Sequence, residues 1–428
     1  MKSKKVLLVI ALVIIASMLF TACKPAAVEP AAAEEEAAPA EEEAAVEEEA
    51  AVEEEAMEVA EDEWGNIVIP AGEELTIGLS SALTGGYAVY GQDMLNGVEL
   101  AITQFGDIQG WTVVAEGGDD QCEPAPGMTV AEKFATNPYL IGVIGPMCSG
   151  TVVPASEIYD EHHIVMISPS STAVVVTARG MESIFRTVAN DDLQAEVTVG
   201  FLNGDKGVTS LAVIHDQSLY GEGLGQAVSD KFEEAGGTVT AFEGITRGDV
   251  DFSSVISTVL ETEPEAIYWG GMDAEGALLI SQLRNAQYEG IYMGPDGIKS
   301  VPSYIEASGG AAEGSFVTFG AVAGATGYED FEAAFTEAYD APVAYGPGSY
   351  DSATILLQAA AAVAKVDADG NLVIGRKALA DMVRNTPYAG VTGDLGFTET
   401  GDLGKVSITV FEAVGGDFEA VKTVDFGE

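Results

Sequence analysis

From residue 73 onward, the chain alternates short apolar runs with longer stretches in which apolar residues recur every three or four positions. Short apolar runs predict strands, and the three-to-four spacing predicts amphipathic helices. The first series of expected elements comprises strands at 75–79, 112–115, 140–144 and 165–167, and helices at 93–105, 127–136 and 151–159. This alternation is typical of parallel sheets whose strands are connected by crossover helices.

A second series of the same kind starts near residue 192. Its expected strands are 211–214, 239–242, 266–269 and 291–293, and its expected helices are 221–235, 252–260 and 274–286. After residue 315 the pattern becomes helical, with helices expected at 350–365 and 377–385 and antiparallel strands at 407–413 and 420–424. Two such series predict an α/β protein of two Rossmann-like lobes, each built on a parallel sheet.

The N-terminus has the pattern of a secretory signal. Three lysines precede an apolar run at 6–20, which ends in Thr-Ala-Cys at 21–23. The run is too short to span a bilayer comfortably, so we expect a signal peptide at 1–22. Its end resembles a bacterial lipoprotein box, although Phe20 stands where an aliphatic residue is usual, and this resemblance implies lipid on Cys23. An uncleaved anchor with an incidental cysteine is the alternative.

The segment after Cys23 has the composition of a tether. Residues 24–63 are almost only Ala, Glu, Pro and Val, with four glutamate triplets. Like charges repel and no apolar stripe is available for burial, so an extended chain is expected. We therefore predict a lipid-anchored linker at 23–72.

The charge of the chain excludes some partners. With 18 Lys and Arg against 69 Asp and Glu, the formal net charge is −51, which argues against nucleic acid and against an anionic lipid surface. At 428 residues, with 47% hydrophobic residues, the chain is long enough for more than one substantial core.

Two segments carry the main functional signal. Each of 144–150 and 167–172 is a short apolar strand that runs into a small, hydroxyl-rich loop. Side by side at the ends of parallel strands, such loops offer backbone N–H groups and hydroxyls to one small anion. Such loops are suited to binding a ligand rather than to catalysing a reaction of it.

Five further stretches, in one order along the chain, carry a family resemblance: LTGGYAVYG at 83–91, DDQCEP at 119–124, PASEIY at 154–159, VIHDQSLYGEG at 213–223 and MGPDG at 293–297. The chain from about residue 73 resembles the periplasmic substrate-binding proteins of branched-chain amino acid ABC transporters. The resemblance implies the type I periplasmic-binding fold, whose lobes are joined by a three-segment hinge. We expect crossings near Ala189, Phe319 and Val391, with an N-terminal lobe of 73–190 and 319–391 and a C-terminal lobe of 191–318 and 392–428.

The same resemblance implies which residues hold the two ends of an amino acid. Ser149 and Thr172 match the positions that hold the ligand carboxylate, although Ser149 could equally cap the helix that follows. Asp296 matches the position of the ammonium partner, where the family more often has Glu. Its alternative role is that of an exposed turn residue before glycine.

The remaining predicted ligand contacts line the cleft in the family. They are Tyr90, Met147, Ser170, Ser171, Tyr220, Met272 and Tyr345. Ser170 and Ser171 stand where the branched-chain binders carry Ala, so their hydroxyls either bond the ligand or satisfy the loop backbone. Each aromatic residue could instead serve only core packing.

Two cysteines remain besides Cys23. In an exported protein, Cys122 and Cys148 are candidates for a disulfide, and in the family the cysteines at these positions are bonded. Two free thiols or a metal pair are the alternatives.

Catalytic and metal motifs are missing from the sequence. The three histidines form no HExxH pattern, and Ser149 lacks the Gly-x-Ser-x-Gly elbow. We expect no enzyme activity, no cofactor and no metal. The predicted protein is a monomeric, extracytoplasmic lipoprotein that binds an amino acid and delivers it to an ABC permease with its ATPase subunits. The alternatives are a binder of an amide, urea or aromatic acid, and a ligand sensor for a membrane receptor.

Overall fold

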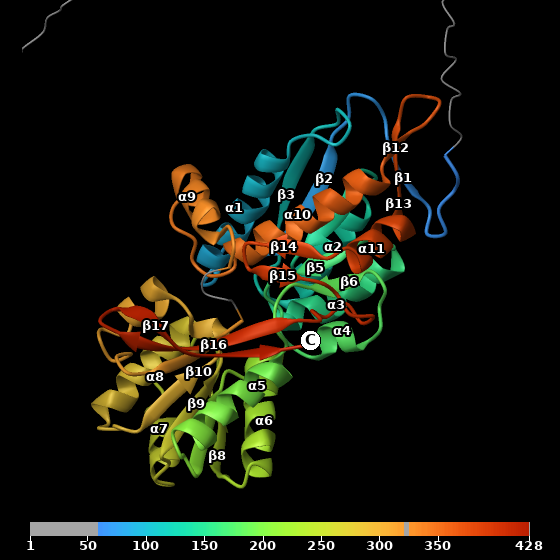
Figure 1. Ribbon diagram of the computed structural model, residues 1–428. Helices are drawn as coiled ribbons and strands as arrows, with labels where there is room; N and C mark the ends of the chain where they lie inside the picture. Colours follow the sequence, from blue (N-terminus) through green and yellow to red (C-terminus); the bar gives the residue numbers. More distant parts are fainter. Residues whose placement is uncertain (1–58, 321–324, 428) are drawn as a thin grey trace, which may run out of the picture. The chain divides into compact units, whose positions relative to one another are not determined.

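The computed structural model describes residues 59–320 and 325–427 (Figure 1). The predicted signal peptide, Cys23 and most of the predicted linker lie outside these residues. No helix within the two described ranges combines the length and the apolar character that crossing a membrane requires.

The first sheet is parallel and has the strand order β3-β2-β4-β5-β6. Its strands are β2 (Leu75–Ser81), β3 (Val113–Asp119), β4 (Leu140–Ile144), β5 (Met166–Ser168) and β6 (Ile184–Arg186). All seven residues of β2 are buried, as expected for a strand covered on both faces. The four strands predicted here are confirmed, whereas the three-residue β6 is too short to give a periodic signal.

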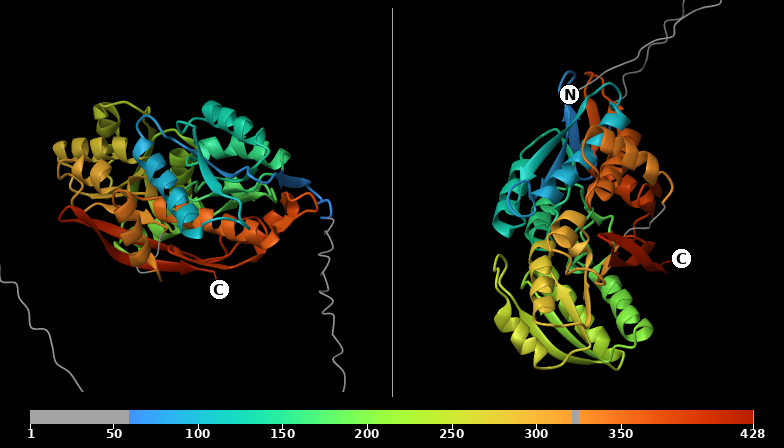
Figure 2. Two further views of the ribbon diagram at one scale, coloured as in Figure 1. Left: turned by 90° about the horizontal axis from the view of Figure 1, so that it is seen from above. Right: turned by 90° about the vertical axis from the view of Figure 1, so that its left-hand side faces the viewer.

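Helices cover both faces of this sheet. One face carries α1 (Ala88–Phe105), α10 (Gly346–Val363) and α11 (Arg376–Asn385), and the other carries α2 (Pro124–Ala135), α3 (Ser149–Glu161) and the short α4 (Val175–Ala178). Figures 1 and 2 show that α1 and α10 lie side by side although they are far apart in sequence. Gly97 permits this approach, because a Cβ there would lie 2.3 Å from the carbonyl oxygen of Gly346.

The second sheet has the order β17-β16-β11-β10-β9-β7-β8. Its strands are β7 (Ser210–His215), β8 (Thr238–Gly244), β9 (Ala266–Gly270), β10 (Ile291–Gly294), β11 (Phe316–Phe319), β16 (Val406–Val414) and β17 (Asp417–Phe426). Neighbouring strands among β8, β7, β9, β10 and β11 pair in parallel. Strand β16 pairs antiparallel with β11 and with β17, and the antiparallel pair of β16 and β17 was predicted.

The second sheet is also covered on both faces. Helices α5 (Asp191–Val199) and α6 (Leu219–Glu234) cover one face, and α7 (Ser253–Leu260) and α8 (Asp273–Asn285) cover the other. Three single-turn elements complete this part: η1 (Gly200–Asp205), η2 (Asp296–Ile298) and η3 (Val301–Glu306). The predicted α/β architecture with two parallel sheets is therefore confirmed.

Two expectations about the chain's course are wrong. The helical part expected directly after residue 315 is preceded by a strand, because β11 pairs with both β10 and β16 and comes before α9 (Tyr328–Ala338). The predicted linker does not reach residue 72. Strand β1 (Asn66–Ile69) pairs antiparallel with β13 (Leu372–Gly375), which also pairs with β12 (Lys365–Val366), and Ile67 and Ile69 are buried.

The third crossing lies later than the predicted Val391. After β14 (Tyr388–Gly390) and β15 (Gly393–Leu395), the chain still packs against the first sheet. Phe397 contacts Phe185, with 5.0 Å between ring centroids, and Asp402 forms an ion pair with the buried Arg186. We therefore propose that the chain changes lobe between Leu403 and Val406.

Candidate functional site

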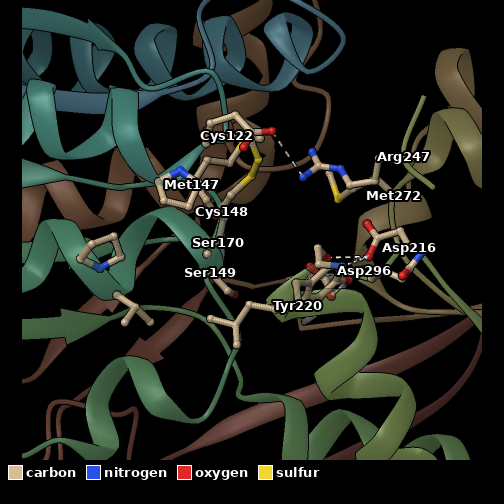
Figure 3. A pocket seen from close by; sticks show the side chains of 18 of the residues that line it. Cys122, Met147, Cys148, Ser149, Ser170, Asp216, Tyr220, Arg247, Met272 and Asp296 are labelled. Carbon is tan, nitrogen blue, oxygen red and sulfur yellow. Dashed lines mark hydrogen bonds and ion pairs between the residues drawn. A yellow bond between two sulfur atoms is a disulfide. The ribbon is translucent and has the colours of Figure 1, made fainter. Parts of the chain in front are cut away.

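A cavity of about 480 Å³ lies where loops from the ends of both sheets face each other (Figure 3). Seven of the ten predicted ligand contacts line it: Met147, Ser149, Ser170, Tyr220, Met272, Asp296 and Tyr345. Three do not line it: Tyr90, Ser171 and Thr172. The first-lobe wall comes from the loops after β3, β4 and β5 and from Tyr345, and the second-lobe wall comes from the loops after β7, β8, β9 and β10.

Ser149 is the first residue of α3 and is almost fully buried. Its Oγ accepts a hydrogen bond of 3.2 Å from the backbone N–H of Ala173, which ties the two hydroxyl-rich loops together. The helix is capped by Cys148 without a side-chain hydrogen bond, so the alternative N-cap role of Ser149 is not observed.

The hydroxyls of Ser170 and Ser171 are used within the loops. Ser170 Oγ donates to the carbonyl oxygen of Met147 at 3.1 Å, and Ser171 Oγ lies 2.9 and 3.0 Å from the carbonyl oxygens of Met147 and Pro146. These contacts satisfy loop carbonyls, which is the second of the two roles expected for this pair.

Thr172 keeps an unused polar atom. The residue is fully buried, and its Oγ1 makes no hydrogen bond of standard geometry to the part of the chain that the structure describes. Its backbone carbonyl is held by Arg186 Nη1 at 2.9 Å and by the N–H of Asp191 at 2.9 Å. The orientation of this residue is thus fixed, and its hydroxyl lies next to the Asp191 carboxylate.

Asp296 forms the start of η2, directly after β10, and is buried rather than an exposed turn residue. Its Oδ1 accepts from Gln194 Nε2 at 2.8 Å and from the Tyr220 hydroxyl at 2.7 Å, and its Oδ2 accepts from the Tyr345 hydroxyl at 3.1 Å. Burial raises the pKa of this carboxylate, and the three hydrogen bonds oppose that rise.

The position of Tyr345 depends on a buried carboxylate of α1. Asp93 accepts hydrogen bonds from the backbone N–H groups of four consecutive residues, Val343, Ala344, Tyr345 and Gly346, at 2.6 to 3.0 Å. This clamp holds the start of α10, and with it the tyrosine that reaches Asp296 on the other lobe.

A second buried carboxylate lies near Asp296 and was missed in the sequence. Asp191 is the first residue of α5, and burial, together with the charge of Asp296, raises its pKa to about 7. Its Oδ1 makes no hydrogen bond of standard geometry to the described residues, but the Thr172 hydroxyl lies close enough to Asp191 to oppose the rise of its pKa. Because Asn190 caps α5, the acidic residues that follow it look like ordinary first-turn residues.

Tyr90 links the lobes without lining the cavity. Its hydroxyl donates to Asp273 Oδ2 at the start of α8 at 2.6 Å, and its ring lies 5.6 Å from that of Tyr345 between centroids. The predicted role of Tyr90 as a cleft wall is therefore replaced, in this structure, by a contact between the lobes.

The outer end of the cavity is charged, which the sequence motifs did not indicate. Arg247 lines the cavity 3.9 Å from Glu123 Oε1, with its guanidinium 5.2 Å from the ring centroid of Tyr87. Asp216 accepts hydrogen bonds from Ser218 through Oδ1, whereas its Oδ2 has no partner in the described ranges. Arg247 follows β8 in a loop without a recognisable motif, so no sequence signal pointed to it.

Cys122 and Cys148 both line the cavity and are joined in a disulfide, with their Cα atoms 5.3 Å apart. The structure thus favours the predicted bond over two free thiols. The disulfide ties the loop that carries Ser149 to the segment that follows β3.

Residues 74–417 match the family described as periplasmic binding protein. The chain belongs to this family. It is 33% identical over 349 residues to a leucine-, isoleucine-, valine-, threonine- and alanine-binding protein of Pseudomonas aeruginosa, covering 80% of this chain and 90% of that protein. A Leu/Ile/Val/Thr-binding protein of Salmonella typhimurium is 35% identical over 249 residues, which is 58% of this chain and 68% of that protein.

Solved structures agree with this assignment. A leucine-binding protein from Thermotoga maritima superposes with a TM-score of 0.75 at 25% identity, covering 82% of this chain and 98% of that chain. The predicted type I periplasmic-binding fold and the predicted substrate-binding role are confirmed.

Proposed function

We propose that this periplasmic binding protein holds a free α-amino acid in the cavity between its lobes and delivers it to an ABC importer. The observation that carries the proposal is the difference between the two ends of the site. The buried carboxylate of Asp296 lines one side, with the buried Asp191 near it but outside the lining, and neutral donors around Ser149 lie on the other side. An ammonium and a carboxylate on one small molecule match this polarity.

The carboxylate end is built from α3 and the loop after β5. The first N–H groups of a helix have no acceptor within the helix, and Ser149 and Gly150 bring this first turn to the cavity wall. The Thr172 hydroxyl, which lies next to Asp191 and outside the cavity lining, adds a donor nearby. We assign the ligand carboxylate to Ser149 and Thr172, as the family resemblance implies.

The ammonium end is built from the second lobe. Burial raises the pKa of both Asp191 and Asp296, and the charge of Asp296 raises the pKa of Asp191 further. A ligand ammonium between them would supply the missing positive charge and favour their ionised forms. We therefore assign it to both carboxylates, with Tyr220 and Tyr345 orienting Asp296.

The wall between the two ends suits an aliphatic side chain. Met147, Val153, Leu219 and Met272 present apolar surface to the cavity, and the thioethers can adapt to different shapes. Relatives named for leucine, isoleucine, valine, threonine and alanine support this class of ligand.

The remaining parts of the proposal concern location and partners. We propose a monomeric, non-catalytic, extracytoplasmic lipoprotein anchored through Cys23, whose closed form docks on an ABC permease served by ATPase subunits. Family membership and the N-terminal sequence support this role. A binder of an amide, urea or aromatic acid, or a sensor for a membrane receptor, would use the same fold.

A thermal-shift screen of the purified protein against the twenty amino acids, simple amides, urea and benzoate tests the ligand class. A ligand at 100 times its dissociation constant adds about 2.7 kcal/mol to the free energy of unfolding. We expect shifts with leucine, isoleucine or valine that are lost in Asp296→Asn. Shifts with amides or urea and none with any amino acid would contradict the proposal.

A further inference from the structure

A second cavity of about 310 Å³ lies on the other side of the contact between Tyr345 and Asp296. It shares these two residues with the first cavity, and its other lining residues are different. The start of α10 contributes Pro347 and Gly348 to it, and the second lobe contributes Phe319 and Phe411. Both lobes therefore form its walls.

The second cavity contains a cation without an anionic partner. Lys299 Nζ lies 4.6 Å from the ring centroid of Phe411, 4.7 Å from that of Phe418 and 5.6 Å from that of Phe319. Among the described residues, no carboxylate lies within ion-pair distance of Nζ, and no hydrogen-bond acceptor is recorded for it. Burial lowers the pKa of this ammonium, and the distant Asp417 opposes the shift only in part.

Cation–π contacts compensate only part of the cost of removing an ammonium from water. An ammonium also carries three N–H donors, which aromatic faces satisfy poorly. A ligand carboxylate placed beside Lys299 would supply both the charge and the acceptors that the protein does not provide.

Aromatic and other apolar side chains line much of the rest of the cavity. The rings of Phe319, Tyr328, Tyr345 and Phe411 and the ring of Pro347 face it. Aromatic walls of this kind bury a planar apolar body, and they contact such rings edge-on or in offset stacks.

We propose that this cavity is a second ligand site, which takes a small monocarboxylate with a planar apolar body and pairs its carboxylate with Lys299. An α-amino acid is a poorer fit than a monocarboxylate, because the cavity offers an ammonium only the carboxylate of Asp296, which the first cavity shares. The site is thus distinct from the one proposed for the transported amino acid, and it does not depend on that proposal.

Calorimetric titration with sodium benzoate tests the second site in the wild-type protein, in Lys299→Met and in the matched control Lys206→Met. Lys206 also lies over aromatic rings, 5.2 Å from Phe201 and 4.7 Å from Phe316, but it is exposed and lines neither cavity. The control therefore removes the same charge and the same kind of ring contact.

We expect Lys299→Met to weaken the affinity for benzoate by at least about tenfold, because a charge-assisted hydrogen bond is lost. Lys206→Met should leave the affinity for benzoate within about twofold of the wild-type value. Leucine should bind both variants as it binds the wild type, and benzoate should not displace leucine. Absence of benzoate binding, equal binding by Lys299→Met, or displacement of leucine by benzoate would overturn the second site.

A crystal structure with benzoate provides the readout that needs no variant, should Lys299→Met fail to fold. Density beside Lys299 Nζ supports the proposal, and density only beside Ser149 overturns it. The two proposals are tested by different results. Absence of leucine binding would contradict the amino-acid site in the first cavity, and absence of benzoate binding that depends on Lys299 would contradict the site in the second cavity.

Discussion

The two walls of the first cavity are built from different chemistry. On the first lobe, the loops at Ser149 and Ser170 offer hydroxyls and backbone groups that carry no net charge and bond mostly to one another. On the second lobe, the wall holds ionisable groups, with Asp296 and Asp216 buried and Arg247 near the outer end. The neutral wall thus offers a ligand hydrogen-bond donors without charge, whereas the charged wall offers ionisable groups whose charge a ligand can balance.

This difference suggests how ligand binding favours closure. A carboxylate binds weakly to a neutral donor wall alone, and an ammonium binds weakly to a solvated aspartate alone. When the lobes close, both contacts form on the same molecule in a site with little water, so each is strengthened. Contacts such as Tyr90 to Asp273 and Tyr345 to Asp296 already join the lobes in this structure.

The largest effect on binding should come from removing the charge of the second-lobe wall. Asp296→Asn should weaken the binding of leucine by about 2 to 5 kcal/mol, because the ligand ammonium loses its buried partner. This corresponds to a loss of affinity of roughly 30-fold to several-thousand-fold. Calorimetry measures the change. Asp249→Asn removes an exposed carboxylate as the matched control. Unchanged affinity in Asp296→Asn would favour an amide or aromatic acid as the ligand.

The neutral wall should depend on its disulfide for stability. Replacing Cys122 and Cys148 together by Ser should lower the free energy of unfolding by about 3 kcal/mol, because the bond closes a loop across a sequence separation of 26 residues. Urea denaturation measures this loss, and reduction of the wild-type protein should reproduce most of it. Equal midpoints for the oxidised wild type and the double variant would contradict the expectation.

Replacing single hydroxyl residues of the neutral wall by alanine distinguishes hydroxyls that bind the ligand from hydroxyls that bond only within the loops. Ser149→Ala and Thr172→Ala should each weaken the binding of leucine by about 1 to 3 kcal/mol. The double variant should deviate from additivity, because both hydroxyls bind the same ligand carboxylate. Ser170→Ala is the matched control, since its hydroxyl already bonds Met147. A larger loss in Ser170→Ala than in the other two would reverse the assignment.

A further expected effect is a pH dependence of the stability of the ligand-free protein. Burial raises the pKa of Asp191 to about 7, above the usual value of 3.8, so the folded state holds this proton more tightly than the unfolded state does. Its stabilising contribution is complete at pH below 3.8 and is lost as the pH rises through 7.

Thermal unfolding between pH 5 and pH 8 measures this dependence. Asp191→Asn should flatten the slope but not abolish it, because burial also raises the pKa of Asp120 and of Asp351 to about 6. A wild-type slope that matches that of Asp191→Asn would show that Asp191 does not titrate in this range.

The sequence predicts the neutral wall better than the charged wall, for a physical reason. The loop at Ser149 is a local unit of strand, turn and helix, so neighbouring residues in the sequence are also neighbours in space. The environment of Asp296 depends on Gln194 and Tyr345, which come from distant parts of the chain. Family resemblance located Asp296, but no local pattern pointed to Asp191.

The same limit applies to the fold. Long periodic helices and buried strands such as β4 were predicted closely, since their patterns extend over many residues. Strand β11 is four residues long and is stabilised by pairing with β10 and β16, and β1 is a strand only because β13 lies beside it. Their partners are far away in sequence, so the local pattern alone is insufficient.

The central claim is that one molecule is held at both ends, its carboxylate by the Ser149 wall and its ammonium by the Asp296 wall. Displacement of labelled leucine by unlabelled leucine, by 3-methylbutylamine and by 4-methylpentanoate tests it most directly, because the two analogues each lack one charged end. The account predicts that leucine displaces the label at least about tenfold more effectively than either analogue. Displacement by either analogue as effective as that by leucine would contradict it.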